Sequence, residues 1–416
     1  MAKIKAFKAL RPIADFASEV AALPYDVVTN KEAREIIKNN PYSFLKIDRP
    51  EVELGNAENI SVEELNEKAG KDFHNMIKNK VFIKDVNEAF YVYSMEHNGN
   101  VQKGLAVCTS IDDYLQDIIK KHEHTLYEKE IDRINHVIKT GAHTGPIMMT
   151  YKKKEEISKI IDKWTAKHKP IYDLLDEEVL IKIWAIDDGD IIQELTHLFE
   201  DVESLYIADG HHRAAAAVKV GQKMRKKFPN YTGREEFNFF LSVLFPSDEL
   251  TILDYNRLIK DLNNKTDKEI VEEISEKFEI FYQGSKAIKP TEKYTFSMYM
   301  KGRWFGLRAK ADFFDKNDLV KNLDVSILHD NLISEIFDIK DPRKDERIEF
   351  VGGTKGLEEL QDYVDSGKMK VAFVLYPTSI DELMNIAETG NVMPPKSTWF
   401  EPKLRSGLLI HTFMNE

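Results

Sequence analysis

The chain has 416 residues, of which 42% are hydrophobic and 31% charged, and its formal net charge is −12. This length predicts two or three domains, and the composition excludes a globally disordered protein. The negative charge argues against a general nucleic-acid-binding protein, because an acidic surface repels phosphate backbones. One cysteine, Cys108, allows no internal disulfide, and no apolar run approaches the roughly 20 residues of a membrane span. We therefore expect a cytoplasmic protein with no membrane partner.

The first half of the chain mixes turn signals with predicted strands and one long helix. Turn signals such as Leu23-Pro24-Tyr25-Asp26 interrupt short apolar segments up to about residue 85. Strands are predicted over 90–96 and 104–110, and Asn98-Gly99 between them is a strong hairpin signal. A charged helix is predicted from about Asp113 to Thr140, followed by a buried strand over 146–151.

The second half alternates predicted strands and helices. The strands are expected over 180–186, 204–208, 237–245 and 371–376, and the helices over 191–198, 211–228, 267–278 and 380–387. The helix over 211–228 should bury a stripe formed by Ala214, Ala217, Val218, Gly221 and Phe228, and a hairpin should turn at Lys301-Gly302. The mixture of hairpins with strand–helix pairs predicts a mixed α/β, or α+β, fold and not a purely parallel sheet.

The segment Asp209-Gly210-His211-His212-Arg213 carries the sharpest functional pattern. A predicted strand ends there, Gly210 allows a tight turn, and a helix begins, so backbone N–H groups and the positive end of the helix dipole gather at one point. Arg213 and the two imidazoles add donors that suit phosphate. Asp209 would cap the helix or hold Mg²⁺. The alternative is an ordinary helix start with exposed histidines.

Glu123 lies between His122 and His124 and follows two lysines, which favours an ionised carboxylate that acts as a base or a metal ligand. The alternative is a solvated helix face. A histidine zinc site is less favoured, because the His-Glu-x-x-His pattern is absent.

A third segment, Met393-Pro394-Pro395-Lys396-Ser397-Thr398, combines stiff prolines with the donors Lys396, Ser397 and Thr398. Functional residues are enriched on such loops, although a structural turn would have the same composition.

These motifs together resemble two related groups of proteins. The order of Lys121-His122-Glu123, Arg133, Gly141, Pro146-Ile147 and the Asp-Gly-His-His-Arg turn resembles the free serine kinases of the ParB/sulfiredoxin-like superfamily. Over nearly its whole length the chain resembles the prokaryotic domain-of-unknown-function family 1015. The stretches that carry this second resemblance are Leu23–Val28, Asn40–Leu45, Asp48–Glu51, His122-Glu123, 209–213 and Met393–Thr398.

The resemblance implies a ParB/sulfiredoxin-like core with additional N- and C-terminal α/β segments. We expect an N-terminal segment over 1–100, the core over 101–248, and a C-terminal domain over 249–416 that contributes the Lys-Ser-Thr loop. A longer spacing between Pro146-Ile147 and Asp209 than in the compact kinases implies an insertion. Sulfiredoxin chemistry is not expected, because His211 stands where a sulfiredoxin has its cysteine, and no basic reader helix suggests a DNA-binding clamp.

The resemblance also implies an activity, that of a kinase with an alcohol group as acceptor. Glu123 matches the position that activates the substrate hydroxyl, with Asp209 as a second catalytic residue and Mg²⁺ ligand. Asp209, His211, His212 and Arg213 match the turn that binds phosphates, and Gly210 is expected to bind phosphate with them. His122 and the Lys-Ser-Thr loop are weaker substrate or phosphate contacts. The expected ligands are Mg²⁺, a nucleotide (ATP or ADP) and a small metabolite, with free serine first.

Two other functions use the same residues. One is a nucleotide-binding switch without turnover of a small molecule, and the other is a phosphatase or reverse transferase directed at phosphoserine. Turnover with and without serine, followed by product analysis, separates the three. A homo-oligomer is compatible with all of them.

Overall fold

The turn at Asn98-Gly99 forms the central hairpin of a nine-stranded sheet in the computed structural model, which describes residues 1–54 and 60–414. Both turn residues have positive φ, 51° and 78°, as a two-residue hairpin turn requires. They join β4 (Phe90–His97) to β5 (Asn100–Ser110). The other strands are β1 (Ile4–Lys5), β6 (Ile119–Lys120), β8 (Ile147–Tyr151), β9 (Tyr172–Asp176), β10 (Val179–Ile186), β11 (Leu205–Asp209) and β12 (Phe239–Pro246).

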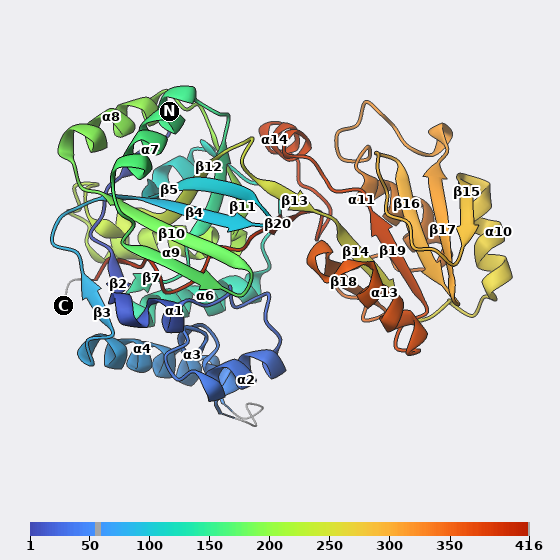
Figure 1. The fold of residues 1–416 in the computed structure, drawn as a ribbon, viewed down its shortest axis with the longest axis horizontal. Coiled ribbons are helices and arrows are strands. Elements are labelled where there is room, and N and C mark those ends of the chain that lie inside the picture. The colour runs from blue at the N-terminus through green and yellow to red at the C-terminus, as the bar shows by residue number, and fades with distance from the viewer. Residues whose placement is uncertain (55–59, 415–416) are drawn as a thin grey trace. The chain divides into compact units, whose positions relative to one another are not determined.

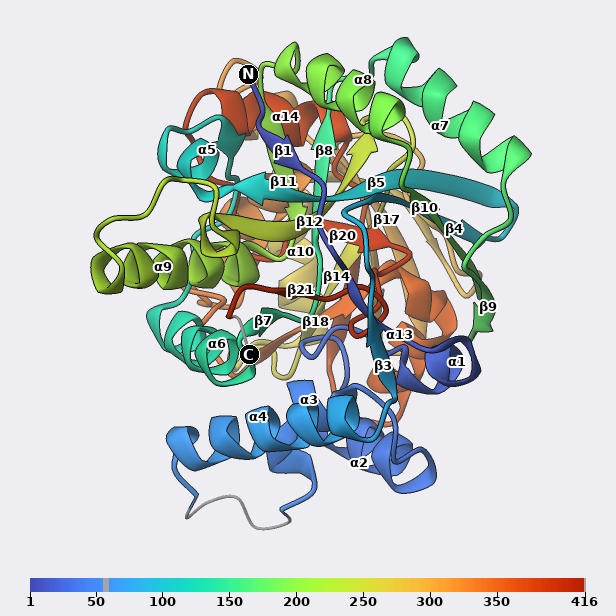
Figure 2. The same cartoon turned by 90° about the vertical axis from the view of Figure 1, so that its left-hand side faces the viewer.

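This sheet is mixed, with the strand order β6-β11-β8-β12-β5-β4-β10-β9 and β1 paired to β5 (Figure 1). The β6–β11 and β8–β12 pairs are parallel, and the other pairs are antiparallel. Helices cover both faces, with α7 (Glu155–Lys167) and α8 (Gly189–Glu200) on one and α9 (His211–Lys227) on the other (Figure 2). The helix α6 (Tyr127–Thr140) packs against α9. The order and the covering helices confirm the predicted mixed α/β fold.

Short elements complete this part of the chain around a second, smaller core built on Phe44, Phe73 and Phe82. Thr29 and Ser61 cap α2 (Asn30–Asn39) and α4 (Val62–Lys78) through reciprocal bonds with a glutamate three residues on. The remaining helices are α1 (Ala17–Val20), α3 (Leu45–Asp48) and α5 (Ile111–Leu115), and the remaining strand pairs are β2 (Leu10–Pro12) with β3 (Phe82–Lys84) and β7 (Ala142–His143) with β21 (His411–Thr412).

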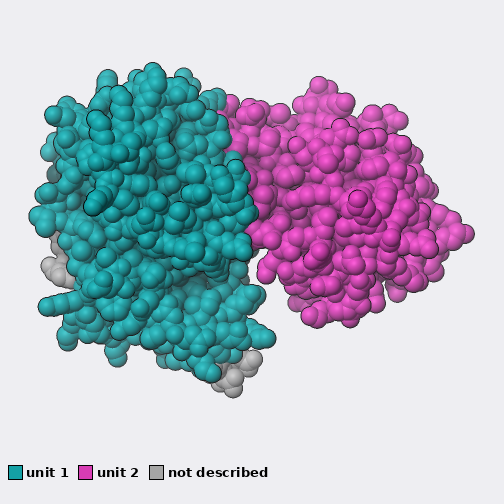
Figure 3. All heavy atoms as spheres, viewed as in Figure 1, with its two compact units in different colours: residues 1–121, 125–250, 402–416 teal, residues 122–124, 251–401 magenta. Residues whose placement is uncertain are grey.

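The described chain forms two units, shown in different colours in Figure 3. Unit 1 takes residues 1–121, 125–250 and 402–416 and contains the nine-stranded sheet, whereas unit 2 takes 122–124 and 251–401. The three-part division at 100/101 and 248/249 remains a prediction. Among the described residues no helix is both long and apolar enough to cross a membrane.

Unit 2 has its own antiparallel sheet of six strands. These are β14 (Tyr255–Ile259), β15 (Phe278–Gly284), β16 (Thr295–Met300), β17 (Arg303–Ala309), β18 (Ile348–Gly352) and β19 (Val371–Leu375), in the order β15-β17-β16-β19-β14-β18. Trp304 and Tyr299 pack with Leu360 and Val364 in its core. The helices are α10 (Asp267–Lys277), α11 (Asp324–Leu328), α12 (Ser334–Ile336), α13 (Gly356–Asp365) and α14 (Ile380–Glu388), and β13 (Thr251–Leu253) pairs with β20 (Trp399–Glu401).

Two predictions about local structure are wrong. The helix expected over 113–140 is interrupted, because Ile119 is fully buried in β6 beside β11, and Asp117 takes a positive φ of 59° before it. Burial of Ile119 in the sheet therefore prevails over the local helical pattern. Phe228 is 47% exposed and does not extend the buried stripe of α9, since it follows the last helical residue, Lys227.

Gly221 provides a test of how closely α9 packs. A Cβ at this position would lie 2.5 Å from the Phe237 carbonyl oxygen and 2.7 Å from Ile111 Cδ1, too close for either to stay in place. We expect Gly221→Ala to lower the free energy of unfolding in urea by about 1–3 kcal/mol, although alanine normally stabilises a helix interior. Gly189→Ala is the control, because a Cβ there meets no atom within 4 Å. An unchanged stability for Gly221→Ala would contradict the packing described.

Candidate functional site

A bulge and a glycine shape the turn between β11 and α9. The register of β11 against β8 shifts between Ile207 and Asp209, so one extra residue stands just before the turn. Gly210 then adopts φ 97° and ψ 31°, the left-handed region that favours glycine. A Cβ at Gly210 would also lie 3.0 Å from Nε of Arg213, so the glycine makes room for that side chain to fold back over the turn.

The N-terminus of α9 is electrostatically positive. Its first turn contains no acidic residue, and Gly210 at the N-cap has no side chain with which to accept a hydrogen bond. The first N–H groups of any helix lack partners within the helix, and the helix dipole adds partial positive charge there. His211, the first residue of α9, is only 6% exposed. This end of the helix is therefore suited to an anion.

Arg213 is held beside the turn by two interactions. Its Nη1 donates to the Pro146 carbonyl oxygen at 2.7 Å, and its Nη2 donates to Asp209 Oδ2 at 3.2 Å. Burial lowers the pKa of Arg213, but Asp209 and other acidic groups outweigh this effect and raise the pKa, so the guanidinium stays charged. Lys403 Nζ lies 3.7 Å from the same Asp209 oxygen.

Asp209 thus faces two cations, and this donor set does not fit a resident Mg²⁺. A magnesium ion needs oxygen ligands at about 2.0–2.1 Å, and the positive charges of Arg213 and Lys403 would oppose it. Mg²⁺ at Asp209 remains a prediction that this geometry does not favour.

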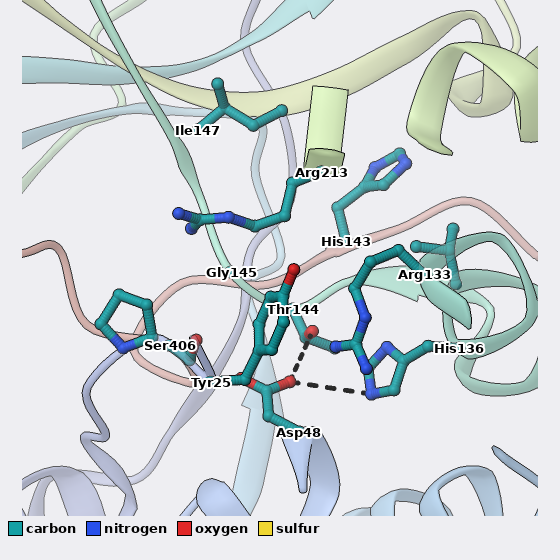
Figure 4. Close-up of a pocket in the computed structure, with 12 residues that line it drawn as sticks. Tyr25, Asp48, Arg133, His136, His143, Thr144, Gly145, Ile147, Arg213 and Ser406 are labelled. Atoms are coloured by element: carbon teal, nitrogen blue, oxygen red, sulfur yellow. Dashed lines mark hydrogen bonds and ion pairs between the residues drawn. The ribbon is translucent and has the colours of Figure 1, made fainter. Parts of the chain in front are cut away.

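A small cavity within unit 1 is lined by Arg213 together with residues that come from five other parts of the chain (Figure 4). Among them are Tyr25, Asp48, Arg133, Thr144 and Ser406. The C-terminal segment closes one side, because Ser406 N donates to the Ala22 carbonyl oxygen at 2.8 Å and Gly407 N donates to that of Thr144 at 3.1 Å. The cavity volume is about 30 Å³. One water needs roughly 10–15 Å³, so the cavity can take one small chemical group.

The cavity presents buried charges of both signs. Asp48 is 4% exposed, and its carboxylate accepts a hydrogen bond from Thr144 Oγ1 at 3.3 Å. Arg133 pairs with Asp132 at 2.6 Å, and the centre of the Tyr25 ring lies 4.1 Å from its guanidinium carbon. Figure 4 shows the Tyr25 ring between the side chains of Arg133 and Arg213 in this view. A ligand group of either charge would therefore find a partner here.

His136 completes the wall beside Asp48. Its Nε2 lies 3.1 Å from the Ile47 carbonyl oxygen, to which it donates, and 3.7 Å from Asp48 Oδ1. Burial lowers the pKa of His136, and the positive charge of Arg133 adds to the effect despite Asp48. A neutral His136 leaves Asp48 without a full positive charge on that side.

The residues predicted from sequence are divided between the two units. Asp209, Gly210, His211, His212 and Arg213 lie together in unit 1, whereas His122 and Glu123 belong to unit 2. Lys120 and Lys121, which follow Asp117 in the chain, both form ion pairs with Asp117. The functional roles of all these residues remain predictions.

The loop of Lys396, Ser397 and Thr398 also belongs to unit 2. Ser397 Oγ donates to the Pro394 carbonyl oxygen at 2.6 Å, and the Ser397 carbonyl oxygen accepts from Thr378 Oγ1 at 3.0 Å. These bonds shape the loop itself, and a contact with substrate remains a prediction.

Sequence reasoning assigned no role to several residues of the cavity. Tyr25 and Asp48 lie in two stretches that carry the family resemblance, so their position in the sequence held a signal. Thr144 and Ser406 gave no such signal in the sequence. Nothing distinguishes them from other hydroxyl residues until the fold brings distant segments together.

The chain is similar to one protein family and to several solved structures. A family model described as "Protein of unknown function (DUF1015)" matches residues 4–326. No curated protein matches the chain. One similar solved structure is a free serine kinase mutant in complex with AMP, at 16% identity and TM-score 0.35, which covers 73% of this chain and 92% of that chain.

Two further solved structures are similarly distant. A free serine kinase mutant in complex with ADP is 15% identical, with TM-score 0.35 and coverage of 74% and 93%. A conserved hypothetical protein from Pyrococcus furiosus is 14% identical, with TM-score 0.34 and coverage of 73% and 94%. Likeness at this level carries no conclusion about the activity of this chain.

The lowered pKa of His136 predicts how stability depends on pH. Between the folded-state pKa and the ordinary value of 6.5, the unfolded chain binds a proton that the folded chain does not, so stability falls as pH drops below 6.5. We expect the loss of unfolding free energy between pH 7.5 and pH 5.5 to be smaller in His136→Gln than in the unmodified protein. His197→Gln, at a side chain that is 78% exposed, serves as the control. Equal losses in His136→Gln and the unmodified protein would contradict a neutral, buried His136.

Proposed function

This chain belongs to the DUF1015 family, and we propose that it is a nucleotide-dependent phosphotransferase that acts on a small hydroxylated metabolite, with free serine as the first candidate. The observation that supports this proposal is the partly buried Arg213, which lies both in the turn at the positive end of α9 and in the wall of the unit 1 cavity. One residue can thereby contact the phosphates of a nucleotide and the group that enters the cavity.

The turn at 209–213 is proposed to hold the phosphates. Phosphoryl transfer depends on positioning and charge neutralisation more than on covalent catalysis, and a helix N-terminus with a charged arginine supplies both. Because Pro146 and Asp209 fix the guanidinium of Arg213, little conformational entropy is lost when a phosphate binds.

The cavity is proposed to select the acceptor. Its volume of about 30 Å³ admits one small group and excludes a nucleoside. A free amino acid carries a carboxylate, which Arg133 could bind, and an ammonium group, which Asp48 could bind, so either of these could be the one group that enters the cavity. Both partners are buried, which strengthens such contacts relative to water.

The proposed reaction transfers the terminal phosphoryl group to the acceptor. The serine hydroxyl oxygen forms a bond to the terminal phosphorus, the bond from that phosphorus to its bridging oxygen breaks, and the nucleotide leaves with one phosphate fewer. Glu123 is the proposed base that accepts the hydroxyl proton.

The first experiment is nucleotide turnover with and without serine, with the products identified by ³¹P NMR. Phosphoserine that forms in step with the shortened nucleotide is the expected result. Binding without turnover would instead indicate a nucleotide-binding switch, and release of inorganic phosphate from added phosphoserine would indicate the phosphatase. Either of these results would overturn the proposed direction and acceptor.

Arg213→Ala tests the phosphate site. Loss of a charge-assisted contact costs about 1.5–3 kcal/mol, so the dissociation constant for the nucleotide should rise by about one to two orders of magnitude in calorimetry. Arg234→Ala removes an exposed arginine of the same unit and should leave affinity unchanged. Equal affinities for the two variants would count against the turn as the phosphate site.

Glu123→Gln separates chemistry from binding. A general base contributes about 10²–10⁴-fold in rate, so turnover should fall by that order while nucleotide affinity stays the same. Glu128→Gln alters an exposed glutamate nearby in the chain and should change neither quantity. A Glu123→Gln variant with normal turnover would remove Glu123 from the mechanism.

A further inference from the structure

Arg257 on β14 is a buried cation that lacks an acidic partner. It is 3% exposed, and among the described residues its guanidinium forms no ion pair with a carboxylate. Its hydrogen bonds go only to carbonyl oxygens, with Nη1 donating to Tyr255 at 2.7 Å and Nη2 to Lys396 at 2.9 Å. Its guanidinium carbon also lies 4.6 Å from the centre of the Phe350 ring. Burial accordingly lowers the pKa of Arg257 to about 10. A buried charge is costly unless something compensates it.

The same arginine lines a cavity of about 360 Å³ within unit 2. This volume is typical of small-molecule sites, which span about 300–1,000 Å³. Lys340 and Arg343 also line the cavity, and its one lining carboxylate, Asp341, is paired with Arg343 at 2.9 Å. Lys340 Nζ lies 3.4 Å from Asp338 Oδ1, a carboxylate that does not line the cavity. Positive charge therefore exceeds negative charge in the wall, and the excess suits an anionic ligand.

Another part of the cavity lining is apolar and stiff. Pro342, Pro394, Pro395 and Val325 contribute to it. A ligand that fills the cavity would thus meet both cations and proline rings.

Two local conformations at the cavity are unusual. His329, which lines it, begins a π-helical segment, His329–Ile333, and such segments are frequent at functional sites. Lys396 has a positive φ of 60°, and its carbonyl oxygen is the one that accepts from Arg257. Arg257 thereby fixes the proline loop in a conformation that a non-glycine residue adopts rarely.

We propose that this cavity binds a small phosphate monoester, with the phosphate against Arg257 and Lys340 and the remainder against the prolines. The phosphate supplies the negative charge that Arg257 lacks inside the protein. Most of the lining lies beyond residue 326, where the family match ends, and the site is independent of the phosphotransferase proposal.

Calorimetric titration of the full chain with phenyl phosphate tests the site. The titration is made in an Arg213→Ala background, so that the turn of unit 1 does not contribute. Lys340→Ala should raise the dissociation constant about tenfold, because it removes one charged contact. Lys344→Ala removes the same charge four residues later from a side chain that does not line the cavity, and it should have no effect.

Two comparisons complete the design. Arg257→Gln should abolish binding while circular dichroism reports a folded chain, and if this variant does not fold, the Lys340→Ala and Lys344→Ala pair decides alone. Phenyl phosphate should bind more tightly than benzoate, which offers a carboxylate on the same ring. Absent binding of phenyl phosphate, equal affinities in the two lysine variants, or tighter binding of benzoate would each overturn the proposal.

Discussion

The positive φ of Gly210 is the constraint on which the candidate site of unit 1 depends. The bulge in β11 and the left-handed glycine turn the chain directly into α9, whose first turn contains no acidic residue. The same missing Cβ lets Arg213 fold back toward Pro146 and Asp209. Helix dipole, backbone donors and guanidinium are thereby brought to one place by a single residue.

The two cavities handle buried charge in different ways. In unit 1, Arg133 has Asp132 and Arg213 has Asp209, while Asp48 accepts a bond from Thr144, so the charges are supported before any ligand arrives. Such a site is preorganised, which favours orientation and catalysis. In unit 2, Arg257 has carbonyl oxygens and aromatic rings as partners, and it forms no ion pair with a carboxylate of the described residues. An anionic ligand would therefore gain more binding free energy from Arg257 than from the paired arginines of unit 1.

Much of the fold could be predicted from the sequence, because local signals agree with the tertiary structure. Asn98-Gly99 marked the central hairpin, and the strand before Asp209 and the helix after Gly210 were predicted within one residue of their observed limits. The helix predicted over 113–140 failed where burial of Ile119 in the sheet outweighed the local pattern. Burial by residues that are distant in the chain cannot be detected from the spacing of apolar residues in one segment.

The candidate site was predictable only in part, for a related reason. The 209–213 turn is contiguous in the chain, so its strand, glycine and helix could be predicted directly. The cavity next to it joins Tyr25, Asp48, Arg133 and Ser406 from distant segments, and only folding reveals that they meet. Arg257 was not predicted as a site residue either. The lack of a carboxylate partner for an arginine in a strand becomes visible only in the three-dimensional structure.

The most direct test of this account is a crystal structure of the full chain with ADP. It should place a phosphate of the nucleotide within hydrogen-bonding distance of the backbone N–H groups at 211–213 and of the Arg213 guanidinium. ADP bound elsewhere, with its phosphates away from this turn, would contradict the central claim that Gly210 and Arg213 form the phosphate site.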